Sequence, residues 1–236
     1  ANKFNKNIMN KTTNLVIVAH PDDEILGFGA TGAKLVEQGE AVQPVILCGD
    51  VDARTHRPTN VELNKDMLRA NKLLGFSNPM LGSFPNIKMN TVDHLEIVQF
   101  IEKQIIYFRP TRIFTHHPSD LNDDHVQISK ACTAAARLFQ RRTDIPQLES
   151  LNYMEILSST DWSFPLNGLN FSPNTYIDIE NYLDLKISAL ACYRSVMKDP
   201  PHPRSDEVMR GHAAYRGGQS GFIYAEAFQT VFQTNL

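Results

Sequence analysis

The stretch NLVIVAHPDDEILGFGATGAKLVEQG, residues 14–39, decides the fold class of this chain. Its first part, residues 14–19, is apolar and rich in β-branched residues, which is typical of a short strand buried on both faces of a parallel sheet. After His20, apolar residues recur at helical spacing over residues 24–38, and Gly39 is a common helix stop. The stretch therefore predicts a strand, a polar loop and a helix.

The same alternation continues along the chain and indicates an α/β protein. Further strands are predicted at residues 42–48, 78–84 and 111–116. Helices are predicted at residues 61–74, 91–108 and 125–140. Strands that alternate with helices form right-handed βαβ units, so we expect a mostly parallel sheet covered by helices.

The last third of the sequence is less regular than the rest. Two strands, a helix, and a final strand or apolar tail are expected at residues 148–157, 174–179, 180–196 and 222–232. Residues 198–221 are rich in proline, glycine and charge, and we predict that they form a mobile active-site or interface segment.

Length and composition exclude several classes of protein. The 236 residues are 42% hydrophobic and 21% charged, as in ordinary globular domains. We expect one domain over residues 1–236, with residues 1–12 as a flexible tail. The net charge of −3 argues against nucleic acid as a partner, and no apolar stretch approaches the ~20 residues of a membrane span.

The cysteines favour a reducing compartment. Cys48, Cys132 and Cys192 are far apart and form no CxxC pair, which excludes a disulfide scaffold and a Cys-rich zinc knuckle. The polar start of the chain has no apolar core of a secretion signal. We therefore expect a cytoplasmic protein.

Two polar clusters, HPDDE at residues 20–24 and HHPSDLNDDH at residues 116–125, each follow a predicted strand. Ligands of an open parallel sheet bind outside the carboxyl ends of its strands, so we expect the two clusters to meet. Together they offer imidazoles and carboxylates without a thiolate. This set suits a catalytic zinc ion or another divalent ion of similar preference.

Adjacent carboxylates in a loop can have different functions. One of Asp22 and Asp23 can bind a metal while the other takes a proton from metal-bound water, whose pKa the ion lowers towards ~7. The alternative is that one of them caps the following helix, and Asp124 and His125 can likewise be ordinary residues of a helix N-terminus. A cap explains neither His20 nor the doubled acid.

Three segments carry a resemblance to a known family. VIVAHPDDEILGFGATGAKL, HHPSDLNDDHVQISKA and GGQSGFIYAEAF resemble the motifs of the PIG-L/LmbE-like zinc-dependent N-deacetylases, and the likeness spans about residues 14–230. The resemblance implies a Rossmann-like three-layer fold. It also implies one zinc ion per chain, and it favours a homo-oligomer.

The resemblance also implies roles for individual residues. His20, Asp23 and His125 would bind the zinc ion, and Asp22 would be the general base. Asp124 would act through hydrogen bonds on the catalytic groups or hold substrate. Members of the family act on N-acetylglucosaminyl groups joined to varied carriers, so the expected reaction is removal of an N-acetyl group from a small amino-sugar conjugate.

One position departs from the family pattern. Some members have a histidine three residues before the second-motif ligand, where this chain has Asn122. Asn122 can donate a neutral hydrogen bond to substrate, or His202 or His212 can serve as the oxyanion stabiliser or acid. Arg54 is a candidate contact for a sugar hydroxyl or an anion, the alternative being a solvated loop arginine.

Two other functions compete with deacetylation. Clustered Asp and His at strand ends also serve metal-dependent phosphoesterases, but no glycine-rich phosphate cradle accompanies them here. A non-catalytic sugar-binding relative is favoured by Asn122 and opposed by the intact His20, Asp22, Asp23 and His125. Gly29 and Gly32 do not form GxGxxG, so we expect no nucleotide cofactor.

Overall fold

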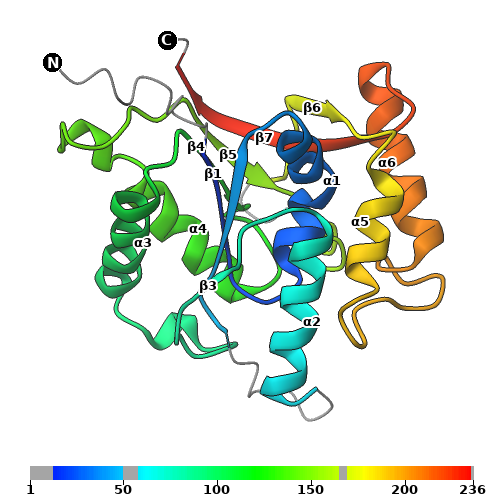
Figure 1. The fold of residues 1–236 in the computed structure, drawn as a ribbon, viewed down its shortest axis with the longest axis horizontal. Coiled ribbons are helices and arrows are strands. Elements are labelled where there is room, and N and C mark those ends of the chain that lie inside the picture. The colour runs from blue at the N-terminus through cyan, green and yellow to red at the C-terminus, as the bar shows by residue number, and fades with distance from the viewer. Residues whose placement is uncertain (1–12, 50–57, 165–168, 235–236) are drawn as a thin grey trace, which may run out of the picture.

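A seven-stranded sheet lies in the middle of the structure, with helices on both of its faces (Figure 1). The computed structural model describes residues 13–49, 58–164 and 169–234, and the predicted flexible tail lies outside them. The strands are β1 (Thr13–Val18), β2 (Ala41–Ile46), β3 (Met80–Leu81), β4 (Arg112–His116), β5 (Ser150–Met154), β6 (Thr175–Asp178) and β7 (Ala225–Gln233).

The strand order is β3-β2-β1-β4-β5-β7-β6. β1 to β5 pair in parallel, whereas β7 runs antiparallel to both β5 and β6. This topology confirms the predicted α/β fold with its mostly parallel, Rossmann-like sheet. It also shows that the apolar residues near the C-terminus form an internal strand of the sheet.

Helices cover the two faces unequally. The helices are α1 (Asp23–Glu37), α2 (Asn60–Leu73), α3 (His94–Phe108), α4 (Asp123–Ala135), α5 (Leu183–Leu190) and α6 (Asp206–Ser220), with 3₁₀ turns at Met89–Thr91 and Leu138–Gln140. α3 and α4 lie on one side of the sheet, and α1, α2, α5 and α6 lie on the other (Figure 1).

The alternation of side chains along β1 divides the apolar core in two. Leu15 and Ile17 point into the core on the α3 and α4 side, while Val16 and Val18 point into the core that contains α1, α2 and α5. All four side chains are fully buried, as expected for a central strand covered on both faces. β1 is thereby held rigidly in the centre of the molecule.

Three predicted helices have different bounds in the structure. Residues 91–108 become helical only from His94, because the Asp93 side chain caps the helix by accepting a hydrogen bond from Leu95 N. The helix predicted at 125–140 begins at Asp123, where Asn122 is the cap, and ends at Ala135. The helix expected at 180–196 is reduced to α5.

Residues 198–221, predicted to form a mobile active-site or interface segment, are helical over their second half. α6 occupies that half, with the fully buried Ser205 as the N-cap that accepts from Val208 N. Met209, Ala213 and Gly217, spaced four residues apart, face the protein interior. These small and widely spaced residues make the helical pattern inconspicuous among the charged ones.

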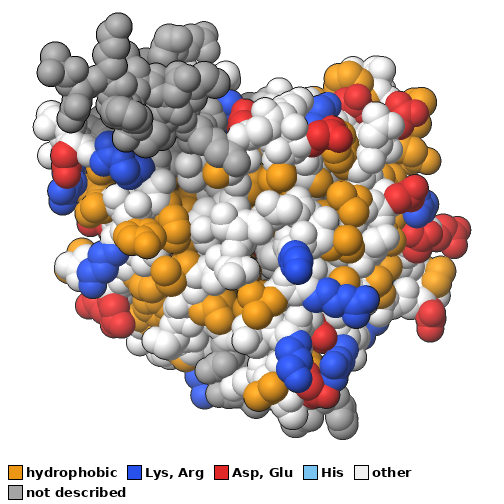
Figure 2. Space-filling view, viewed as in Figure 1, with side chains coloured by type: hydrophobic (Ala, Val, Ile, Leu, Met, Phe, Trp, Pro, Cys, Tyr) orange, Lys and Arg blue, Asp and Glu red, His pale blue; other side chains and the backbone are white. Residues whose placement is uncertain are grey.

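Charged side chains of both signs lie on the face of the molecule drawn in Figure 2, in agreement with the low net charge. The face drawn in Figure 2 carries scattered hydrophobic groups, with acidic and basic side chains intermixed at its lower edge, over the start of α2. Among the described residues, no helix is both long and apolar enough to cross a membrane.

Candidate active site

The two predicted clusters meet at the carboxyl ends of β1 and β4. These strands are neighbours, and the chain proceeds from β1 to β2 and β3 on one side while β4 and β5 lie on the other. A reversal of strand order opens a crevice at the carboxyl edge of a sheet. His20 follows β1 and begins the turn into α1, while His116 ends β4 ahead of α4.

Three donor atoms converge at this crevice. Asp23 Oδ2 lies 3.3 Å from His20 Nδ1 and 3.2 Å from His125 Nε2, and the two nitrogens are 3.3 Å apart. We call these three residues the ligand triad. All three are buried.

The ligand triad fits a zinc ion. Separations of this size match one face of a tetrahedron around zinc, whose bonds to nitrogen and oxygen are about 2.0–2.2 Å long. Two imidazoles and one carboxylate are a common set of catalytic zinc ligands. Within the described residues, the buried Asp23 Oδ1 has no hydrogen-bond partner, so the triad leaves acceptor capacity for a cation.

Two carboxylates stand behind the imidazoles of the triad. Asp124 Oδ2 lies 2.9 Å from His20 Nε2, and Asp124 is itself held by the backbone N–H groups of Ile87 and Met89, at 2.6 and 3.0 Å. Carboxylates behind ligating imidazoles orient the ring and select its tautomer. Asp124 thus lies where it can act on His20 through a hydrogen bond, as the family resemblance implies.

Asp120 has the corresponding place beside His125. Its Oδ2 is 3.2 Å from His125 Nδ1, and it accepts hydrogen bonds from the hydroxyls of Ser159 and Thr160. The sequence places Asp120 in the second cluster but assigns it no role. Its position becomes informative only when the loop after β5 brings the two hydroxyls to it.

Closely packed opposite charges shift the pKa values of the triad residues. Burial by itself raises the pKa of Asp23, but His125 and His20 outweigh it and hold the pKa well below its usual range. Burial lowers the pKa of His125, yet Asp23 and Asp120 raise it to about 10. Both shifts favour a proton shared within this cluster, which a cation bound there would have to displace.

His116 differs from the triad histidines. Its Nε2 accepts a hydrogen bond from Ala19 N at 2.8 Å, and its ring stacks on that of His125 with centroids 3.7 Å apart. Burial, together with His125, lowers the pKa of His116 to about 3. His116 is therefore a neutral packing residue that supports the ligand ring.

A cleft of about 570 Å³ opens over the triad. Ligand pockets are commonly about 300–1,000 Å³, so there is room for a sugar ring and part of its carrier. Its lining includes the apolar Leu121 and Trp162 and the basic Arg194, Lys198 and Arg204. Trp162 and the arginines are contacts that the sequence did not identify.

Asp22 faces this cleft and does not cap α1 through its side chain. The described residues give it no side-chain cap bond, and its φ of 119° lies in the left-handed region. Its Oδ2 instead accepts a hydrogen bond from Arg204 Nη1 at 3.0 Å. The capping interpretation thus fails for Asp22, while Asp23 is the first residue of the helix and turns into the triad.

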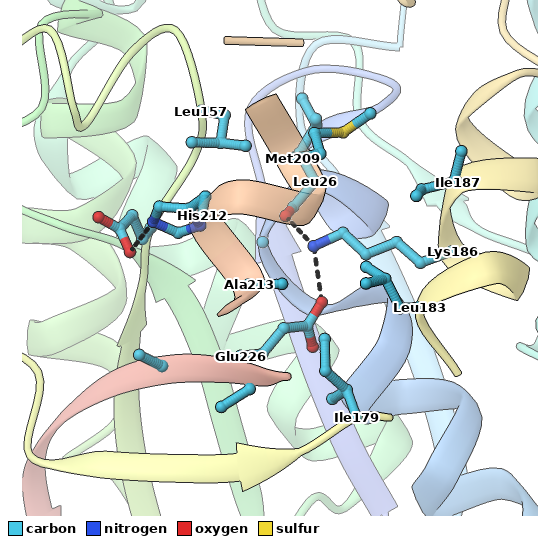
Figure 3. Close-up of a pocket in the computed structure, with 14 residues that line it drawn as sticks. Leu26, Leu157, Ile179, Leu183, Lys186, Ile187, Met209, His212, Ala213 and Glu226 are labelled. Atoms are coloured by element: carbon cyan, nitrogen blue, oxygen red, sulfur yellow. Dashed lines mark hydrogen bonds and ion pairs between the residues drawn. The ribbon is translucent and has the colours of Figure 1, made fainter. Parts of the chain in front are cut away.

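The remaining predicted residues are divided between several places. Asn122 and His202 line the cleft, and Asn122 is also the cap of α4. His212 does not reach the cleft, because α6 carries it away to Glu155, 3.0 Å from its Nε2, beside another cavity (Figure 3). Arg54 lies outside the described residues.

Comparisons with known proteins agree with these motifs. The sequence model of the PIG-L family, described as GlcNAc-PI de-N-acetylase, matches residues 15–136. The uncharacterized deacetylase YaiS of Escherichia coli (strain K12) is 26% identical over 186 residues, 77% of this chain and 90% of that protein. Diacetylchitobiose deacetylase of Thermococcus kodakarensis is 23% identical over 233 residues, 92% of this chain and 82% of that protein.

Solved structures show the same fold. The conserved protein TT1542 from Thermus thermophilus has a TM-score of 0.76 at 24% identity, covering 94% of this chain and 96% of that one. GalB, a 4-carboxy-2-hydroxymuconate hydratase from Pseudomonas putida KT2440, has a TM-score of 0.71 at 19% identity, covering 95% and 98%. Because this fold also occurs in a hydratase, function has to be argued from the site.

Proposed function

Since the chain belongs to the PIG-L family, we propose that it is a zinc-dependent hydrolase that removes the N-acetyl group from an N-acetylglucosaminyl-type amino sugar. The observation that carries the proposal is the ligand triad, whose donor atoms lie 3.2–3.3 Å apart with the Asp22 carboxylate in the same cleft. The deacetylases among its relatives support hydrolysis of an acetamide.

His20, Asp23 and His125 would hold a zinc ion, which would act as a Lewis acid that polarises the carbonyl and lowers the pKa of water. Asp22 takes a proton from the attacking water as its oxygen adds to the acetamide carbon. When the carbon–nitrogen bond breaks, Asp22 returns the proton to the leaving amine, so that acetate and a free amino sugar are formed. One carboxylate serves both steps.

Asn122 lines the cleft and provides a neutral donor that can bind the substrate. His202 also lines the cleft, and its ring meets that of Trp162 edge-on at a centroid distance of 5.5 Å. Asp124 and Asp120 keep the two imidazole ligands oriented throughout.

The test is amine release from a panel of N-acetylglucosaminides by zinc-loaded protein, with metal content recorded. We expect Asp22→Asn to lower kcat by about 10²–10⁴-fold while one zinc ion stays bound. The matched control is Asp144→Asn, which removes an exposed carboxylate paired with Arg142 and is expected to leave kcat unchanged.

Other outcomes would identify the competing functions. Wild-type protein that binds zinc and is stabilised by the conjugates, but releases no amine, would be a sugar-binding relative. Two metal ions per chain with hydrolysis of phosphate esters would indicate a phosphoesterase.

A further inference from the structure

We propose that Arg204 is a positioning residue that holds the Asp22 carboxylate in its working orientation. The inference rests on the proposed function, in which Asp22 handles the proton. Arg204 Nη1 lies 3.0 Å from Asp22 Oδ2, although the two residues are 182 positions apart in the sequence. The exposed fractions of the two side chains are 15% and 11%, so water competes little for this charge-assisted hydrogen bond.

The guanidinium is itself fixed by the loop that follows β5. Arg204 Nε donates to Ser158 Oγ at 2.7 Å and to the Leu157 carbonyl at 3.3 Å. A planar guanidinium bound on one edge presents its other nitrogens in a set direction. Arg204 Nη1 is thereby directed at the Asp22 carboxylate.

The backbone of Arg204 is also held by hydrogen bonds. Arg204 N donates to His202 Nδ1 at 3.0 Å, and the Arg204 carbonyl accepts from Lys198 N at 3.2 Å. The next residue, Ser205, is the fully buried cap of α6. His202 therefore contributes to the site by closing the turn that presents Arg204.

Asp22 needs such a partner because its own backbone is in an unfavourable conformation. Among the described non-glycine residues, positive φ angles occur at Asp22, Ile87, Arg109, Ser158 and Ser195, and all except Arg109 line the cleft. Such conformations persist only where surrounding contacts impose them. Arg204 joins two of these positions, Asp22 and Ser158, through one side chain.

Arg204 differs from Arg194, the other described arginine that lines the cleft. Arg194 is half exposed and pairs with Glu62 and Asp66, whereas Arg204 is more buried and reaches the carboxylate beside the ligand triad. A guanidinium does not lose its proton in proteins, so Arg204 does not act as the acid. Its function is to orient Asp22 and to balance its charge.

The experiment compares Arg204→Ala and Arg204→Lys with Arg112→Ala. Arg112 is likewise a partly buried arginine in an ion pair, with the carboxylates of Glu40 and Glu149, but it lies at the start of β4, at the edge of the sheet opposite the cleft. We expect Arg204→Ala to lower kcat about 10–100-fold, as loss of an outer partner typically does, with KM changed less than about twofold and zinc content intact. Arg112→Ala is expected to keep the wild-type kcat.

Two further readouts separate positioning from a general loss of structure. Millimolar guanidinium added to Arg204→Ala should restore part of kcat, and Arg204→Lys should retain part of it, because lysine brings charge without the planar fork. In metal-free protein, the shift in unfolding temperature of the Asp22→Asn/Arg204→Ala double variant should be smaller than the sum of the single shifts.

Several results would overturn the inference. These are an unchanged kcat in Arg204→Ala, a loss explained entirely by lost zinc or by KM, and additive shifts in the metal-free cycle. Wild-type protein that hydrolyses no acetamide would instead overturn the proposed function, and the metal-free cycle would still test the contact.

Discussion

Helix α1 contacts two buried clusters of charged groups. They differ in whether every charged atom has a hydrogen-bond partner. At its N-terminus lies the ligand triad, which leaves Asp23 Oδ1 without a partner among the described residues. At its middle, Lys186 Nζ donates to Glu226 Oε1 and to the Leu26 carbonyl, each at 2.7 Å (Figure 3). Both clusters are buried, but of the two only the first leaves a described carboxylate oxygen without a hydrogen-bond partner.

The Lys186–Glu226 pair is bonded to the backbone of α1. Leu26 C=O accepts a hydrogen bond from Lys186 Nζ, while Ala30 N and Thr31 N donate to Glu226 at 3.1 and 2.7 Å. The pair thus ties α5 and β7 to the helix that begins with the triad.

The spaces beside the two clusters differ in the same way. The cavity next to the Lys186–Glu226 pair is about 30 Å³, room for about one water molecule, whereas the cleft over the triad is about 570 Å³. A buried ion pair in which each charged atom already has a hydrogen-bond partner is a structural feature. Imidazole and carboxylate groups that converge beside an open cleft, with one carboxylate oxygen still unpartnered, indicate a ligand site.

Removal of one residue of the ligand triad should have the largest effect. We expect His125→Ala to lose zinc and all measurable amine release, because two remaining donors do not make a catalytic zinc site. Metal analysis and activity check this. Prolonged chelation of the wild type should reproduce the loss, and zinc should reverse it. Full zinc occupancy in His125→Ala would contradict the assignment of the site.

The Lys186–Glu226 pair should behave oppositely. Lys186→Met leaves Glu226 buried without its cation, so we expect the free energy of unfolding to fall by about 3–5 kcal/mol, with zinc affinity nearly unchanged. Urea unfolding of the metal-free protein measures it. The control is Lys34→Met on α1, whose ammonium binds the Asp178 carbonyl nearer the surface and should matter less. A larger effect on zinc than on stability would contradict the structural interpretation.

A smaller effect of pH should come from Glu155, which lies beside the cavity of Figure 3. Burial by itself raises its pKa, but His212 and Arg216 outweigh burial and lower it to about 2. A depressed carboxyl pKa stabilises the fold above the unfolded value of about 4.5, and this stabilisation is lost as pH falls towards 2.

Unfolding measured from pH 6 to pH 2.5 tests this expectation. The wild type should lose on the order of 2 kcal/mol more than Glu155→Gln over that range. Parallel curves for the two proteins would show that Glu155 is not held ionised by its partners.

The sequence predicted the parts of this molecule whose physics is local. The β1 strand, the helices with clear apolar spacing and the two motifs were recognised because burial on both faces and helical periodicity leave a pattern in neighbouring residues.

What the sequence did not reveal depends on contacts between distant segments. Arg204 lies in a proline-rich, charged segment whose composition suggested mobility. Its proposed role depends on its contacts with Asp22 and Ser158 in two other loops. His212 looked equivalent to His202, yet the direction of α6 takes it to Glu155.

The sequence alone therefore determined the fold class, the chemical kinds of group available and which strand ends would carry them. Only the tertiary structure decided which of several equivalent acids, imidazoles and guanidiniums meet, and in what geometry. The physical reason is that propensity and periodicity act over a few residues. A bond such as that between Asp22 and Arg204 depends on how every intervening element packs.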